Sequence, residues 1–206
     1  MPMLRLLRAT RRFGRRDVFT DLDFEVAVGE RVLLAGPNGS GKTTLLRCLS
    51  GTLALSTGQA TVAGHPVGSP DAKRATGVCL APEQGLYETL TARQNIALVA
   101  RLRLPCRAVR AAVTGIEEEL GITRYASMPA ARCSAGMRAR ISIARSLVAD
   151  PALLLLDEPG RSLDEQGRRL LWQAIERRTE LTCVIASHHV DDGSRCQQRL
   201  TLTAAG

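Results

Sequence analysis

The chain has 206 residues, enough for one α/β domain with a real hydrophobic core or for one domain with an inserted lobe. Hydrophobic residues make up 45% of it and charged residues 23%, as in ordinary soluble globular proteins. The longest apolar run, residues 152–156, is far too short to cross a bilayer, and residues 1–5 lead into no signal-type apolar segment. We therefore expect neither a membrane span nor export.

The formal net charge of +8 comes almost entirely from arginine, because Lys42 and Lys73 are the only lysines. A general bias toward arginine explains this charge as well as a polyanionic partner does, and a basic surface also suits an anionic membrane leaflet. Aromatic residues are only 3% and do not alternate with the basic ones, so we expect no nucleic-acid partner. The six cysteines form no C-x-x-C pair, which is typical of free thiols in a reducing cytoplasm.

The N-terminal part of the chain predicts two short strands and then a strand–turn–helix unit. Apolar and polar residues alternate at 4–9 and at 24–28, the pattern of half-buried strands. Residues 31–35 form a short aliphatic run that predicts a buried strand, and residues 44–49 begin a helix.

The turn between this strand and this helix, residues 36–44, fits the phosphate-binding pattern G-x-x-x-x-G-K-[ST]. Successive backbone N–H groups of such a loop point inward, and the helix N-terminus adds positive potential, so the turn cradles anionic phosphates. Lys42 is expected to reach the β- and γ-phosphates, and the Thr43 hydroxyl to bind Mg²⁺. The pattern predicts a nucleoside-triphosphate site but does not distinguish a kinase, a GTPase and an ATPase. The expected nucleotide contacts in the loop are Gly36, Asn38, Gly39, Ser40, Gly41, Lys42, Thr43 and Thr44.

Beyond the loop, strands and helices alternate, which predicts a mainly parallel sheet with covering helices. The block between 91 and 149 is helical and separates two predicted strands, so it reads as an inserted lobe. Residues 65–70 are expected to form a loop rich in Pro and Gly. Strands are predicted at 58–64, 76–81, 153–156, 183–186 and 200–202, and helices at 92–104, 108–120, 137–148 and 165–178.

Two acids end the most apolar of these strands. Residues 153–156 are all leucine and are followed by Asp157 and Glu158, so both carboxylates are expected at the carboxyl edge of the sheet, beside the phosphates. Asp157 is then suited to bind Mg²⁺, and Glu158 to orient and polarise the water that attacks the γ-phosphorus.

A specific family resemblance rests on several short motifs in a fixed order. Residues 133–137, C-S-A-G-M, resemble the L-S-G-G-Q signature of ATP-binding cassette (ABC) proteins, although Cys133 and Ala135 depart from it. Ser162-Leu163-Asp164 resembles the D-loop, led in by an unusual Gly160-Arg161, and Ser187-His188 resembles the switch histidine. Phe13 stands where the family carries its adenine-stacking aromatic. With the motifs at 36–44 and 153–158, the resemblance extends over essentially the whole chain and is to the small single-cassette subunits of haem exporters and other exporters.

The Q-loop of the family is the motif that fits least well. Residues 82–91 resemble it, but spacing back from Thr91 places Pro82 or Glu83 where the glutamine belongs, with Gln84 nearby. We assign Gln84 as the residue that binds Mg²⁺ and senses the attacking water.

The resemblance implies an α/β fold of the P-loop NTPase type, with a mainly parallel sheet, an N-terminal antiparallel β subdomain and an inserted helical lobe. Residues 1–206 would form one ABC ATPase domain with its helical subdomain at about 88–149. Ser134 and Gly136 would bind the γ-phosphate held by a second nucleotide-binding subunit, identical or different. His188 would contact the γ-phosphate in its own subunit and hold Glu158 and the water, and Asp164 would join the nucleotide contacts.

The implied function is ATP hydrolysis, with ATP and Mg²⁺, in a subunit that powers transport through a separate transmembrane permease subunit. The chain would lie peripherally on the cytoplasmic face of the inner (plasma) membrane and receive the permease at about residues 85–103. One alternative is a soluble ABC-type ATPase acting on nucleic acid or ribosomes. Another is a regulatory cassette that binds ATP and hydrolyses it slowly.

Overall fold

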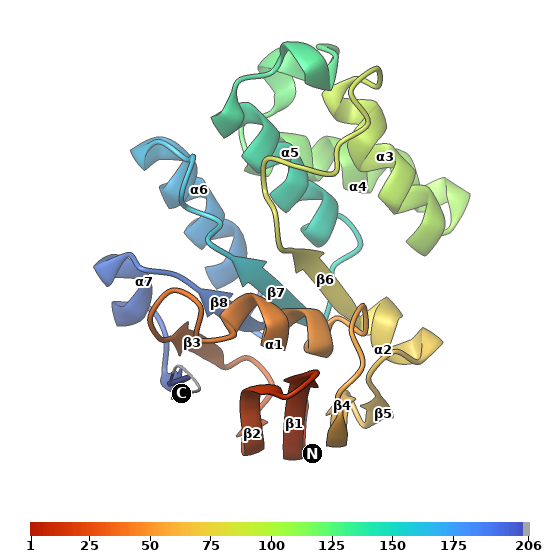
Figure 1. Ribbon diagram of the computed structural model, residues 1–206. Coiled ribbons are helices and arrows are strands. Elements are labelled where there is room, and N and C mark those ends of the chain that lie inside the picture. The colour runs from red at the N-terminus through yellow and green to blue at the C-terminus, as the bar shows by residue number, and fades with distance from the viewer. Residues whose placement is uncertain (204–206) are drawn as a thin grey trace. The chain divides into compact units, whose positions relative to one another are not determined.

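The computed structural model describes residues 1–203, in two compact units (Figure 1). The first unit consists of residues 1–80, 152–157 and those from 180 onward. The second consists of residues 81–151 and 158–179, so it contains the whole predicted helical lobe.

An antiparallel sheet with the strand order β2-β1-β4-β5 occupies the N-terminal part of the first unit. Its long β1–β2 hairpin extends further than the sequence predicts, because residues 10–13 continue the first strand and residues 16–23 belong to the second. At its tip Arg12 pairs with Asp17 across the two strands, and Gly14 makes the turn with φ +58°. The strands are β1 (Leu4–Phe13), β2 (Arg16–Val26), β4 (Thr57–Val62) and β5 (His65–Pro66).

A parallel sheet with the order β6-β7-β8-β3-β9 forms the centre of the same unit. Every residue of β7 and β8 is buried, which explains why their sequences are nearly continuous apolar runs and not alternating ones. The predicted α/β class with a mainly parallel sheet is confirmed. The strands are β3 (Arg31–Ala35), β6 (Thr76–Cys79), β7 (Leu153–Asp157), β8 (Thr182–Ala186) and β9 (Gln198–Thr201).

Short helices complete the first unit. The helix α1 (Lys42–Leu49) contacts β7 and buries Leu45 and Leu46 completely in the core. The helix α2 (Pro70–Ala75) follows the loop predicted at 65–70, and the sequence analysis missed it. Ser69 caps it by accepting a hydrogen bond from the Ala72 amide, and Pro70 takes the first helical position, where no N–H is needed. The last helix, α7 (Val190–Ser194), was also not predicted.

The second unit is helical, and its helices lie within a few residues of the predicted ranges. Thr91 and Gln94 form a reciprocal capping box that starts α3, and the chain turns into α4 at Pro105. The helices are α3 (Ala92–Arg103), α4 (Cys106–Glu119), α5 (Ala135–Leu147) and α6 (Glu165–Glu176), with single 3₁₀ turns at Thr123–Tyr125 and Ala130–Arg132. No helix within residues 1–203 combines the length and the apolarity that a membrane crossing requires.

Candidate nucleotide-binding site

Three adjacent strands of the first unit deliver predicted site residues to one edge of the parallel sheet. The phosphate-binding loop leaves the end of β3, Asp157 is the last residue of β7, and His188 stands two residues beyond β8. Leu34 and Asp157 both pair with Ala186, so the three carboxyl ends lie level with one another. Ligands of open α/β sheets bind at this edge. The structure thus brings these predicted residues together.

The loop itself folds tightly around the Lys42 side chain. The Lys42 Nζ donates to the carbonyl oxygens of Gly36, at 2.7 Å, and Pro37, at 3.0 Å. Gly36 has φ +145°, and a Cβ there would lie 2.4 Å from the Leu202 carbonyl oxygen and 2.5 Å from the Ser40 Oγ. Glycine is therefore required at position 36 for the loop to close.

The start of α1 is suited to bind an anion. Gly41 precedes the helix with φ +96° and offers no side-chain cap, and the first turn contains no acidic residue. The Ser40 Oγ is buried and has no hydrogen-bond partner within residues 1–203. Uncapped backbone N–H groups, a buried hydroxyl and a buried ammonium together match the acceptor oxygens of a phosphate chain. The residues present therefore fit a nucleotide phosphate.

A pair of oxygen-bearing side chains lies beside the loop. The Thr43 Oγ1 donates to the Asp157 Oδ2 at 2.5 Å, and Asp157 is buried. Hydroxyl and carboxylate oxygens are the ligands that Mg²⁺ prefers, and the ion usually completes its shell with water and substrate phosphates. Thr43 and Asp157 thus fit the metal role predicted for them.

Phe13 ends β1 and exposes half of its surface. The Arg11 guanidinium carbon lies 4.2 Å from the centre of its ring, and the Arg11 Nη1 donates to the Ala54 carbonyl at 3.0 Å. One face of the ring is therefore covered by a cation. The adenine stacking predicted for Phe13 stays a prediction.

In the second unit, the predicted signature residues begin α5. Ser134 is the N-cap, and its Oγ accepts from the Met137 amide at 3.3 Å. Gly136 follows in the first turn, where a Cβ would lie 2.9 Å from the Ser162 carbonyl oxygen. The predicted placement of the signature at a helix N-terminus is confirmed, and its action on a second subunit stays a prediction.

Asp164 caps α6 in a similar way. Its Oδ1 accepts from the Gly167 amide and from the Arg140 guanidinium, each at 2.7 Å. The Gly167 amide bond, followed by the bond from Arg140, lowers the pKa of Asp164 below its ordinary value of 3.8. The side chain therefore fixes the D-loop to α5 and α6, and its predicted contact with a nucleotide stays a prediction.

Glu158 is half-buried and has a left-handed backbone conformation with φ +48°. A non-glycine residue in this region is strained, and such strain clusters at functional sites. The water-activating role of Glu158 stays a prediction.

The segment predicted to be the Q-loop gives an unexpected result. Gln84 is exposed, and its backbone N–H donates a hydrogen bond to the Ala81 carbonyl oxygen. Its neighbour Glu83 is half-buried and accepts a hydrogen bond from the Ser162 hydroxyl. The Glu83 side chain thus contacts another predicted motif, and within residues 1–203 no such hydrogen bond is seen for the Gln84 side chain.

Sequence reasoning also missed the arginines that hold this segment. The Arg138 Nε donates to the Glu83 carbonyl at 3.0 Å, and the Arg145 Nη1 donates to the Gly85 carbonyl at 2.6 Å. These arginines are seven residues apart on α5, so they project from the same face of the helix. The seven-residue spacing of the two arginines is the sequence signal that could have identified them.

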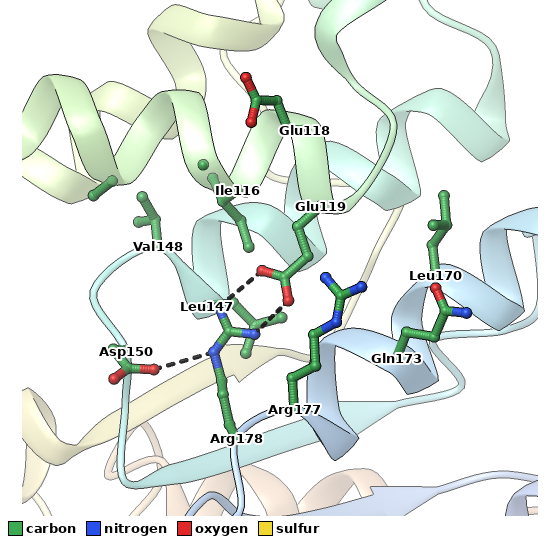
Figure 2. Close-up of a pocket in the computed structure, with 12 residues that line it drawn as sticks. Ile116, Glu118, Glu119, Leu147, Val148, Asp150, Leu170, Gln173, Arg177 and Arg178 are labelled. Carbon is green, nitrogen blue, oxygen red and sulfur yellow. Dashed lines mark hydrogen bonds and ion pairs between the residues drawn. The ribbon is translucent and has the colours of Figure 1, made fainter.

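A separate hollow of about 790 Å³ lies between α4, the end of α5 and α6 (Figure 2). Arg178 crosses it and binds both Glu119 and Asp150. None of the predicted site residues lines this hollow.

Comparisons with known proteins agree with this geometry. Residues 19–161 match the family described as ABC transporter. A Nod factor export ATP-binding protein I from Rhizobium meliloti is 32% identical over 98% of this chain and 61% of its own length. A protein of the same name from Burkholderia orbicola is 34% identical over 95% of this chain and 66% of its own length. The chain thus spans about three fifths to two thirds of these relatives.

Solved structures share the fold. A dimeric post-hydrolysis state of the ATP-binding cassette MJ0796, bound to ADP and Pi, has a TM-score of 0.88 at 20% identity over 98% of this chain and 96% of that one. The cbiO1 protein from Clostridium perfringens, part of the ABC transporter complex cbiONQ, has a TM-score of 0.83 at 24% identity over 100% of this chain and 87% of that one. With the family match over residues 19–161, these findings establish that the chain belongs to the ABC transporter family, as an ATP-binding cassette.

Proposed function

We propose that the chain binds and hydrolyses ATP and thereby powers transport through a separate transmembrane permease subunit. The observation that carries this proposal is the Thr43–Asp157 hydrogen bond beside the Lys42 loop, where a triphosphate and its Mg²⁺ would be held. The relatives are named ATP-binding proteins of Nod factor export, which supports a role in transport. Such a subunit would lie on the cytoplasmic face of the inner membrane.

In this proposal, different residues bind the nucleotide, hold the metal and activate the water. Lys42 and the loop N–H groups bind the phosphates, Thr43 and Asp157 hold Mg²⁺, and Phe13 stacks on the adenine. The bound Mg²⁺ supplies positive charge that stabilises the charge developing on the phosphate oxygens. Glu158 orients the attacking water and accepts its proton, and His188 holds that arrangement. Gln84 is proposed to sense the metal and the water.

We further propose that the working form contains two cassettes, this chain with a second copy or a related subunit. Ser134 and Gly136 stand at the start of α5, where N–H groups and the helix dipole favour an anion. From there they would bind the γ-phosphate held by the loop of the partner. The similar fold of a dimeric cassette supports this arrangement.

A titration with ATP and Mg²⁺ tests the assignment of the loop. Lys42→Ala removes the only basic side chain of residues 36–44, so ATP affinity should fall sharply, whereas Lys73→Ala, which changes the only other lysine, should bind like the wild type. Ser134→Arg should still bind ATP through its own loop but lose hydrolysis, because its bulk blocks the partner's phosphate. Unchanged affinity in Lys42→Ala would contradict the loop assignment, and full activity of Ser134→Arg would contradict the two-cassette arrangement.

A further inference from the structure

Two segments far apart in sequence are joined by one side-chain hydrogen bond in the second unit. The Ser162 hydroxyl, next to the α6 cap, donates to the Glu83 carboxylate. Both side chains are half-buried, so the bond is partly protected from solvent. Hydrogen bonds to a charged acceptor are stronger than neutral ones. The contact therefore links the segment that resembles the Q-loop directly to the one that resembles the D-loop.

The backbone of Glu83 is fixed independently of this bond. The Arg138 Nε donates to the Glu83 carbonyl oxygen at 3.0 Å, while its Nη1 and Nη2 bind the Glu88 carboxylate at 2.8 and 2.6 Å. Arg138 lies in the helix α5. Glu83 thus holds the Ser162 hydroxyl from a fixed position.

Ser162 has a second contact, with the start of α5 itself. Its carbonyl oxygen lies so close to Gly136 that a Cβ there would be 2.9 Å away, nearer than real Cβ contacts allow. Gly136 has no positive φ, so glycine is needed here for this close approach. The Ser162 hydroxyl is therefore held by Glu83, and the Ser162 carbonyl oxygen packs against the first turn of α5.

We propose that Glu83 is a positioning residue that acts through Ser162 and sets the placement of the α5 N-terminus and of Asp164. This inference rests on the proposed function, because that helix start is where the partner's γ-phosphate would be bound. A carboxylate suits the task, since it accepts a hydrogen bond from the serine hydroxyl while the Arg138 bond restrains the Glu83 backbone. We expect Glu83 to affect the turnover of ATP and not its binding, because ATP is bound by the phosphate-binding loop of the first unit.

The test compares Glu83→Ala, Ser162→Ala, their double variant and Glu83→Gln, with Glu118→Ala as the control at an exposed glutamate of the same unit. Each alanine variant should lower kcat at saturating ATP by roughly tenfold, the effect of losing one hydrogen bond to a charged group. The ATP dissociation constant should stay within about twofold of the wild-type value, because the Glu83–Ser162 bond involves no residue of the phosphate-binding loop.

The double variant should be no slower than either single variant, since each single substitution already removes the same hydrogen bond. Glu83→Gln should recover most of the activity because its amide oxygen still accepts from Ser162.

Hydrogen exchange measured on the same proteins keeps this inference separate from the proposed function. Both alanine variants should speed the exchange of amides at 134–138 and 158–164 and leave α4 unchanged, whether or not ATP is turned over. Additive losses in the double variant, a Glu83→Gln as slow as Glu83→Ala, or unchanged exchange in those segments would overturn the positioning role. A wild-type chain without ATP turnover would instead overturn the proposed function.

Discussion

Replacing Arg178 by alanine should destabilise the second unit strongly, because this side chain joins three of its segments. Its Nη1 and Nη2 donate to the Glu119 carboxylate at 2.8 and 2.9 Å, and its Nε donates to Asp150 at 3.1 Å (Figure 2). Its Nη1 also donates to the Ala174 carbonyl at 2.6 Å. The first pair is largely desolvated, with 22% of the Arg178 and 13% of the Glu119 side chain exposed. Asp150 is 82% exposed, so that bond contributes little.

The size of the effect follows from what the substitution leaves behind. Removing one partner of a fully buried ion pair costs about 3–5 kcal/mol. Because Glu119 keeps some contact with water, we expect about 2–3 kcal/mol for Arg178→Ala. In a protein of this size that corresponds to a fall in Tm of roughly 4–12 °C. Glu119→Ala should cost less, since Arg178 keeps its bonds to Asp150 and Ala174.

The chain offers a matched control and a built-in probe. Arg177 is the adjacent arginine; it is exposed, and in the described part of the chain its guanidinium takes part in no ion pair. Arg177→Ala should therefore change stability by less than about 0.5 kcal/mol. Trp172 is the only tryptophan and is buried in α6, so its fluorescence during urea unfolding reports on this unit. If Arg178→Ala unfolds at the same urea concentration as Arg177→Ala, the ion pair does not stabilise the unit.

Two further predictions concern the loop and the α6 cap. Gly36→Ala should abolish ATP binding in a titration and also destabilise the first unit, because its Cβ would collide with the Ser40 Oγ and the Leu202 carbonyl oxygen at the site itself. Asp164→Ala should lower the free energy of unfolding by at least about 1 kcal/mol at pH 7, whereas Asp164→Asn should retain most of the cap. Because the folded pKa of Asp164 lies below 3.8, the part of this stabilisation that needs the charged carboxylate is present above about pH 3.8 and is lost as the pH falls through the lowered pKa, so the difference between the wild type and Asp164→Ala in urea titrations should narrow in acid. A difference that persists unchanged at low pH would show that the carboxylate is not the source of the stabilisation.

The sequence predicted the parts of the site that depend on local pattern. The strand β3, the glycine-rich turn and the start of α1 are contiguous, so residues 31–49 identify a phosphate loop without any tertiary information. The strand β7 could also be predicted locally, because four consecutive leucines indicate a buried strand. Asp157 follows them directly, so its carboxylate is placed at the end of that strand. Parallel pairing then brings Asp157 and the loop to one edge.

Contacts between distant segments could not be predicted in this way. Glu83 and Ser162 are 79 positions apart, and no periodicity relates them, so only the packing of the second unit shows their bond. The short helix α2 was missed because Pro and Gly dominate residues 64–70, although Ser69-Pro70 is a helix start. The strained backbone of Glu158 likewise depends on how the chain leaves β7, which residue types do not encode.

We propose that Glu158 is the residue that activates water when this chain hydrolyses ATP. The most direct measurement is phosphate release by Glu158→Gln alongside ATP binding by the same protein, with Glu180→Gln as a control at an exposed acid. The amide preserves shape but is a far poorer base, so ATP should bind with near wild-type affinity while turnover falls by roughly a hundred- to ten-thousandfold. Glu180→Gln should hydrolyse ATP at the wild-type rate. Turnover near the wild-type rate in Glu158→Gln would contradict the water-activating role of Glu158.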